Sequence, residues 1–249
     1  MKSGIISLAL TFRLAFCAFS AFGQDNEGVA APIVSFDWGP NSQDIVMDVY
    51  ARLHQATGFN EPIDFFYDSE YFEQNSLAAF VQLQKGPAYH AMVIQRNALD
   101  ICRNKNELAY IIAHELSHIV LRHLEKIEIM KEKLCRSLAK KKGWPPPETN
   151  PKTLEHCFSY PVFQNAVRFY LESLEDQADI EGANLMTIAG FDAARSRKVF
   201  RHVADFFWAT SYGIESPRAA MSADDYGHFT LHEREARLDR YVEYLCARH

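Results

Sequence analysis

The chain has little positive charge gathered in one place. Its 249 residues carry 26 Lys and Arg against 32 Asp and Glu, a formal net charge of −6, and the lysines at 140–142 form its one basic block. Three lysines in a row are typical of a solvated helix end rather than of a nucleic-acid surface. We therefore expect no nucleic acid among its partners.

Several motifs are also absent. No two cysteines have CxxC spacing, which argues against a zinc site built from cysteines. No Gly-x-Ser-x-Gly segment occurs, which argues against a serine hydrolase with a nucleophile elbow. The chain has no internal repeat, and its 48% apolar and 23% charged residues are ordinary for a folded protein. The composition thus predicts a single globular domain.

The first 23 residues have the pattern of a secretory signal peptide. Lys2 precedes an apolar run over residues 5–22, and Ala21-Phe22-Gly23 offers small residues for cleavage. We therefore predict a signal peptide at 1–23, a single domain at 24–249, and an exported protein, periplasmic or secreted. The alternative is an uncleaved membrane anchor through residues 5–22, which would place Arg13 at a cost inside the bilayer.

Cleavage after Gly23 would remove two positive charges, so the net charge of −6 would become −8. It would leave four cysteines, and an even number in an exported chain permits two disulfides. Cys135 and Cys157 flank a proline-rich loop and are the pair that we favour; Cys102 and Cys246 are the others. The alternative is four reduced, buried thiols.

Apolar periodicity predicts an α+β fold that is mainly helical, in which a small β-sheet precedes the first long helix. Apolar spacing and turn residues place the strands near 63–67, 78–83 and 89–94. Asn104 and Glu107 have the spacing of a helix N-cap and its reciprocal partner. The expected helices span 43–57, 104–142 (continuing past His123), 161–189, 192–209 and 232–247.

Residues 114–118 read His-Glu-Leu-Ser-His, an HExxH sequence inside a strong helical pattern. On a helix, residues i and i+4 lie on one face, so both imidazoles can reach one zinc ion. Glu115 projects from the turn between His114 and His118 and can act as the base that takes a proton from the attacking water. The pattern predicts a zinc-dependent metallopeptidase; a helix with two surface histidines is the alternative.

A catalytic zinc needs a third protein ligand, and no third histidine follows at the short metzincin spacing. On the 161–189 helix Glu172 and Glu175 are both candidates, and each has an aspartate four residues later, Asp176 and Asp179. Spacing favours Glu175 only slightly. Asp179 could accept a hydrogen bond from the free N–H of a ligand imidazole.

These motifs resemble those of the gluzincin metallopeptidases that include HtpX, the CAAX prenyl proteases and the periplasmic BepA and LoiP peptidases. Residues 106–118 match their first motif, and Glu175-Asp176-Gln177-Ala178-Asp179 matches their second. The resemblance implies a zincin-like domain with one Zn²⁺ per chain, held by His114, His118 and Glu175, with Asp179 behind the ligands. It covers about residues 85–240.

The chain also departs from that family. Residues 88–99 lack the glycines that are usual in this strand of the family. The resemblance implies that this strand pairs with the substrate backbone. The family often has a His-Pro pair before an arginine near the C-terminus, and this chain lacks the proline. The resemblance offers Arg237 as the residue that holds the oxyanion, and His228, His232 and Tyr226 compete for that role. The membrane helices of HtpX and the prenyl proteases are absent, so the likeness is to the soluble, exported branch.

The sequence-based hypothesis is therefore an exported zinc endopeptidase that cleaves polypeptides. We expect it to act in quality control of the cell envelope, where it could associate with membrane or envelope proteins. One alternative is a non-proteolytic chaperone or binding module that contains zinc. Another is a latent protease whose site is covered by the loop 209–232 until a partner arrives. His123 is interpreted as a histidine on the helix surface that packs on the loop; a position near the metal, behind its ligands, is the alternative.

Overall fold

The structure is a computed structural model that describes residues 38–68, 79–84, 89–210 and 231–247. The predicted signal peptide at 1–23, Tyr226, His228 and most of the loop 209–232 lie outside the described residues. None of the described helices is long and apolar enough to cross a membrane.

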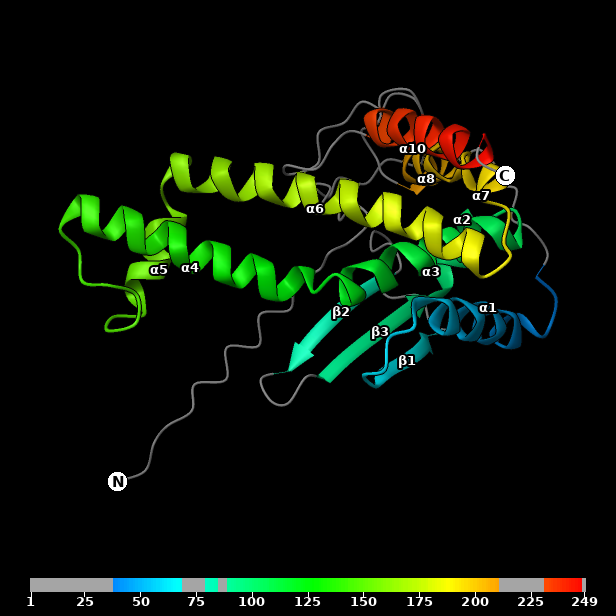
Figure 1. The fold of residues 1–249 in the computed structure, drawn as a ribbon, viewed down its shortest axis with the longest axis horizontal. Coiled ribbons are helices and arrows are strands. Elements are labelled where there is room, and N and C mark those ends of the chain that lie inside the picture. Colours follow the sequence, from blue (N-terminus) through cyan, green and yellow to red (C-terminus); the bar gives the residue numbers. More distant parts are fainter. Residues whose placement is uncertain (1–37, 69–78, 85–88, 211–230, 248–249) are drawn as a thin grey trace.

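The described chain is mainly helical with one small sheet, as predicted, and Figure 1 shows the sheet on one side of a layer of helices. The strands are β1 (Ile63–Asp68), β2 (Ala79–Gln84) and β3 (Tyr89–Gln95). The helices are α1 (Ser42–Thr57), α2 (Arg96–Ile101), α3 (Lys105–Val120), α4 (His123–Lys142), α5 (Lys152–Phe158), α6 (Pro161–Ile188), α7 (Ala193–Ser196), α8 (Val199–Thr210) and α10 (Leu231–Cys246).

The sheet has the order β1-β3-β2, with β1 parallel and β2 antiparallel to β3. Met92 of β3 lies opposite Phe65 on one side and Val81 on the other. Both backbone edges of β3 are therefore used, so the expectation that strand 88–99 pairs with substrate is wrong. Within the described sheet the strands with a free edge are β1, which lies beside α1, and β2, which lies beside α3.

Helix α3 runs through the centre of the main core, and every residue from Glu107 to Ile119 is buried. Its predicted N-cap is confirmed: the Asn104 side chain accepts hydrogen bonds from the backbone N–H groups of Asn106 and Glu107. The Glu107 carboxylate in turn accepts from the Asn104 amide and from the Arg103 backbone N–H. This capping satisfies N–H groups that the first helical turn leaves without partners.

The predicted continuous helix from 104 to 142 is wrong, because the chain breaks between α3 and α4. Arg122 has φ 54° and ψ 42°, the left-handed region, which stops the i to i−4 ladder of α3 before α4 begins at His123. The predicted helix 192–209 is likewise divided into α7 and α8. The short helices α2 and α5 were not predicted, since six or seven residues show too little periodicity to be recognised.

Helix α6 packs along α3 at a very short distance. A Cβ atom added at Gly182 would lie 3.1 Å from the backbone nitrogen and 3.3 Å from the Cα of His114. Gly182 thus allows the two backbones to approach more closely than any larger residue would without a shift of the helices. The consequence is that side chains of α6 reach the motif carried by α3.

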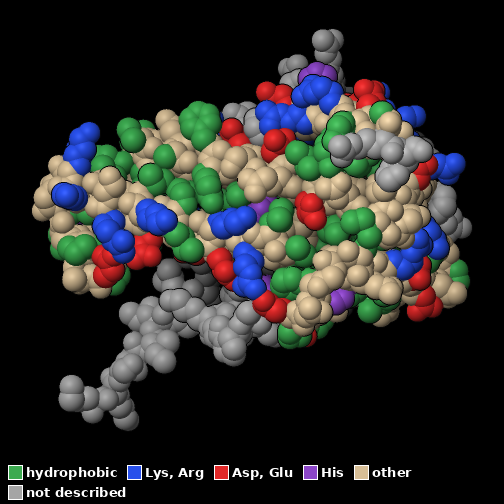
Figure 2. All heavy atoms as spheres, viewed as in Figure 1, with side chains coloured by type: hydrophobic (Ala, Val, Ile, Leu, Met, Phe, Trp, Pro, Cys, Tyr) green, Lys and Arg blue, Asp and Glu red, His purple; other side chains and the backbone are tan. Residues whose placement is uncertain are grey.

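The far ends of α4 and α6, together with α5, form a helical extension with a small core of its own. The predicted disulfide is confirmed: Cys135 of α4 is bonded to Cys157 of α5, while Cys102 and Cys246 are free thiols. Figure 2 shows hydrophobic side chains over this end of the molecule, and the large exposed ones include Ile129, Phe158, Val162 and Phe169.

Removal of this disulfide should destabilise the extension. The bond closes a loop with a sequence separation of 22, and the chain-entropy model gives a loss of about 3 kcal/mol in the free energy of unfolding for a loop of this size. We expect the double variant Cys135→Ser/Cys157→Ser to unfold at a correspondingly lower denaturant concentration. Cys246→Ser, at an exposed free thiol, is the control and should unfold like the parent.

Candidate metal centre

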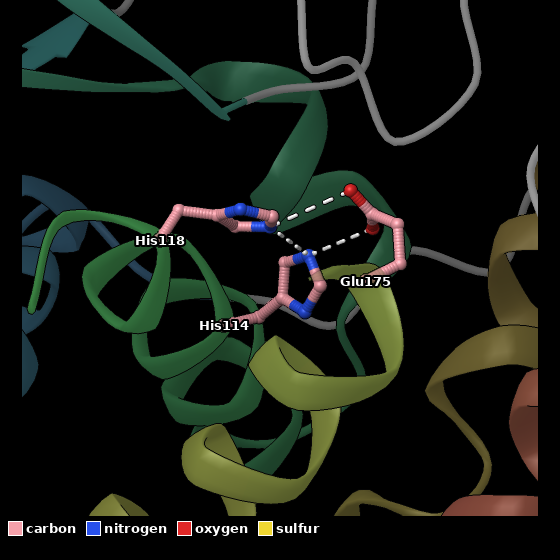
Figure 3. Close-up of side chains that lie close together, drawn as sticks. All are labelled: His114, His118 and Glu175. Carbon is pink, nitrogen blue, oxygen red and sulfur yellow. Dashed lines mark hydrogen bonds and ion pairs between the residues drawn. The ribbon is translucent and has the colours of Figure 1, made fainter. Parts of the chain in front are cut away.

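Three side chains from α3 and α6 meet in the core and turn their polar atoms toward one point, as Figure 3 shows. His114 and His118 lie one helical turn apart on α3, and Glu175 faces them from α6. All three are buried, with exposed fractions of 1%, 2% and 5%. Among the described residues they form the one group of histidine, cysteine or acidic side chains that could hold a metal ion.

The distances between these ligand atoms fit a tetrahedral metal ion. The Nε2 atoms of His114 and His118 are 3.2 Å apart, and Glu175 oxygens lie 3.3 Å and 3.5 Å from them. Ligands bonded at about 2.0–2.1 Å in a tetrahedron are separated by about 3.3–3.4 Å. The side chains are thus already placed around a position that such an ion would occupy.

The second nitrogen of His114 is backed by a carboxylate. Asp179, one turn beyond Glu175 on α6, places Oδ1 2.9 Å from His114 Nδ1. The same oxygen accepts a hydrogen bond of 2.6 Å from the Tyr110 hydroxyl. Because an ionised carboxylate only accepts, it holds the proton of His114 on Nδ1 and leaves Nε2 free to bind a metal.

Arg234 of α10 completes this buried cluster, and no motif in the sequence predicted its role. Its Nε donates to Asp179 Oδ2 at 2.9 Å and its terminal NH2 group donates to Oδ1 at 2.7 Å, while Glu175 Oε2 lies 3.5 Å away. The guanidinium also lies 5.1 Å from the centre of the Phe200 ring. Arg234 falls on the apolar face that Leu231 and Leu238 define, and an arginine on such a face was the available signal.

The other predicted residues lie outside the cluster. Arg237, predicted as the oxyanion-holding residue, forms a 3.0 Å ion pair with Asp176 in which both side chains are about one-third exposed. His232 is exposed. Glu172, the alternative third ligand, is not part of the group that can hold a metal.

His123 is buried, and it lies behind the ligands rather than on the helix surface. Its Nδ1 is 3.0 Å from Nδ1 of His118, and the two rings meet edge to face. The alternative that placed His123 near the metal site thus agrees with the structure. It follows that both histidine ligands have a polar partner on the nitrogen that faces away from the centre.

Glu115 is buried on the same helix, and its Oε2 has no hydrogen-bond partner among the described residues. Burial raises the pKa of its carboxyl to about 8, while the positive charge of protonated His114 acts in the opposite direction. A buried carboxyl with a free oxygen and a pKa near neutrality is suited to accept and return a proton.

The two ligand histidines differ in their affinity for protons. Burial lowers the pKa of His114, but hydrogen bonds to Asp179 and Glu175 outweigh it and raise the pKa to about 9. Burial lowers the pKa of His118 to about 3. Burial opposes ionisation of Glu175, yet His118, His114 and Arg234 hold its pKa well below the usual range. At neutral pH and without a metal, His114 therefore carries a second proton, which a bound cation would displace.

Arg234 and Arg237 provide a matched pair of substitutions. Arg234→Gln leaves Asp179 and Glu175 with one cation fewer inside the core, and breaking a buried ion pair costs about 3–5 kcal/mol in the free energy of unfolding. Arg237→Gln removes a partly exposed pair, for which about 0–1 kcal/mol is expected. Chemical denaturation of the two variants measures the difference; equal losses would contradict the assignment of Arg234 to the buried centre.

Comparison with known proteins agrees with this geometry. A family model described as Peptidase family M48 matches residues 40–244, which include the whole cluster. No curated protein matches the chain. Peptidases of this family are metalloproteases, and the His-His-Glu group found here can hold a metal ion. The match covers most of the sequence, and the chain belongs to peptidase family M48.

Proposed function

We propose that the protein is a zinc-dependent endopeptidase with one Zn²⁺ per chain, held by His114, His118 and Glu175. The observation that carries the proposal is the buried group of two imidazole nitrogens and one carboxylate: the nitrogens are 3.2 Å apart, and each lies 3.3 Å or 3.5 Å from one of the two Glu175 oxygens. Two histidines and one glutamate are a ligand set of catalytic zinc sites, which keep a fourth position open. A structural zinc site would be closed by a fourth protein ligand, and the described residues offer none.

Glu115 performs the proton transfers in this proposal. Zinc would supply a Lewis acid that lowers the pKa of a water molecule and polarises the carbonyl of the scissile peptide bond. The Glu115 carboxylate takes the proton of the attacking water and passes it to the nitrogen of the leaving amine. Its Oε2 is buried and has no hydrogen-bond partner in the described part of the chain, which supports this role, because a purely structural site needs no such base.

Asp179, Tyr110 and Arg234 hold the ligands in place. Asp179 fixes the ring of His114 through Nδ1, and Tyr110 and Arg234 fix Asp179.

Arg234 and Arg237 are the two candidates for stabilising the oxyanion, and they differ in position. Arg234 lies 3.5 Å from Glu175, whereas Arg237 is paired with Asp176. We favour Arg234 for this charge, because it is already desolvated beside a ligand.

The substrate that we propose is an extended polypeptide that adds to the edge of β2 that is unpaired within the described sheet. This strand lies next to α3, and its inner edge is paired with β3. An added strand is recognised mainly through backbone hydrogen bonds, which any unfolded segment can supply. A peptide that lies along an edge can extend in both directions, which suits cleavage inside a chain rather than at its ends.

We further propose that the protein is exported and degrades misfolded or envelope proteins, which would bring it near membrane proteins. The signal-peptide pattern of residues 1–23 supports export. The disulfide between Cys135 and Cys157 supports an oxidising compartment such as the periplasm or the cell exterior. Backbone recognition at a strand edge fits substrates that are defined by lack of structure rather than by sequence.

Two isosteric substitutions test the assignment of ligand and base. Glu115→Gln should keep about one zinc per chain in elemental analysis and lose cleavage of an unfolded protein such as casein, because the base is gone and the ligands remain. Glu175→Gln should lose zinc as well as cleavage. Turnover that survives Glu115→Gln would contradict the mechanism. Zinc without turnover in the parent would favour a binding module or a latent protease.

Zinc binding should release protons. His114 has a pKa of about 9 without metal and must be neutral to bind, so affinity rises with pH and levels off above about 9. In Glu115→Gln, where Glu115 cannot contribute, we expect about one proton released per zinc near pH 7. Calorimetric titration in buffers with different ionisation enthalpies counts the protons; the absence of release would contradict the protonated state of His114.

A further inference from the structure

The contact between His118 and His123 joins two imidazole rings through their Nδ1 atoms. Both rings are buried, and their Nδ1 atoms are 3.0 Å apart. In such a contact one nitrogen carries the proton and the other accepts it. Two arrangements are therefore open to this pair, and only one of them leaves Nε2 of His118 with a lone pair directed at His114 and Glu175.

We propose that His123 is a positioning residue for the metal centre: it accepts the Nδ1–H of His118 and thereby holds this ligand in the tautomer and ring orientation that bind the metal. The inference deepens the proposed function and rests on it, since it concerns the same centre. His118 Nε2 lies 3.5 Å from Glu175 and 3.2 Å from His114 Nε2, so it is the nitrogen on the metal side. The proton of His118 then belongs on Nδ1, where the acceptor within reach is His123.

The two histidine ligands are thus held by different means. His114 faces the carboxylate of Asp179, which can only accept and which carries a full negative charge. His118 faces the imidazole of His123, whose Nδ1 can accept a hydrogen bond at 3.0 Å without a negative charge. The negative charges of Glu175 and Asp179 are balanced in part by Arg234, and the partner of His118 adds no further carboxylate to them. A neutral partner on His118 avoids a further desolvation cost.

The helix break at Arg122 is what brings His123 to this position. On one continuous helix, residues five positions apart are rotated by about 140°, so His123 would point away from His118. The left-handed conformation of Arg122, φ 54° and ψ 42°, ends α3 and restarts the chain as α4 with His123 as its first residue. The side chain of Arg122 forms ion pairs with Glu61, before β1, and with Glu125 of α4.

This left-handed residue is the one non-glycine with positive φ in the part of the chain that the structure describes. Such a backbone costs roughly 1 kcal/mol for an ordinary residue and persists where the surroundings enforce it. Here it coincides with the burial of His123 against a ligand. The left-handed residue therefore lies where it directs His123 toward a metal ligand.

The test compares the parent with His123→Phe, which keeps a ring of similar size and removes the acceptor, and with His123→Gln, which keeps an acceptor. Zinc affinity is measured by competition with a chelator. We expect the dissociation constant to rise about 10–100-fold in His123→Phe, the range found for loss of a partner of a ligand, and to be largely restored in His123→Gln. His156→Phe, an exposed histidine of α5, is the control for a His-to-Phe exchange.

A spectroscopic readout separates this role from simple packing. In the cobalt(II)-substituted protein, the N–H protons of both ligand histidines give strongly shifted proton NMR signals that disappear in D2O. We expect two such signals in the parent. In His123→Phe the signal of His118 should be lost or broadened by exchange with water, while that of His114, protected by Asp179, should remain.

Arg122 gives an independent comparison. Arg122→Gly and Arg122→Val remove the same ion pairs, but glycine adopts the left-handed conformation freely and a β-branched residue does not. Zinc should bind more weakly to the valine variant than to the glycine variant. Equal affinities of the two would overturn the role of this backbone.

The outcomes are distinguishable from failure of the proposed function. A folded parent that binds no zinc would remove the zinc peptidase itself. A parent that binds zinc tightly, with His123→Phe equal to it in affinity and retaining both shifted signals, would overturn the role of His123 and leave the peptidase intact. Circular dichroism of each variant verifies that loss of affinity is not loss of the fold.

Discussion

The close approach of α6 to α3 is the constraint on which the rest of the structure depends. Gly182 lets the backbone of α6 lie against that of His114, where a Cβ atom would be 3.1 Å from the His114 nitrogen. Glu175 and Asp179 lie four residues apart on α6, so both face α3. With the helices at this distance, Glu175 reaches the metal side of His114 and Asp179 reaches its other nitrogen.

This packing buries charge, and the charges then determine what else must be present. Two carboxylates within the core need cations, which Arg234 and the proton on His114 supply when no metal is bound. A divalent cation can take the place of that proton without new charge from the protein. The same cluster explains why α10, far along the sequence, is fixed against α6: its Arg234 is buried in an ion pair with Asp179.

The elements around the centre have different roles. The sheet places the edge of β2 beside α3, where an extended chain can be held. The α3–α4 break turns His123 back onto His118. The disulfide stabilises the extension of α4 and α5, which has its own small core. All three features lie outside the HExxH sequence, and one of them, the break, acts directly on a residue of that sequence, His118.

Local sequence determined much of this protein. The HExxH spacing predicted the two histidines on one helix face, the Asn104–Glu107 pair predicted the start of α3, and apolar periodicity predicted the main helices and three strands, because each of these depends on residues a few positions apart. The choice of Glu175 over Glu172 came from a family resemblance, since both have the same spacing to an aspartate.

Only the tertiary structure decided which side chains meet across the core. It placed Arg234 rather than Arg237 beside Asp179, put β3 between two other strands, and broke the long helix at Arg122. The physical reason is that burial of a charge, the order of strands and a single left-handed residue are set by contacts between distant segments, and such contacts leave no periodic pattern in the sequence.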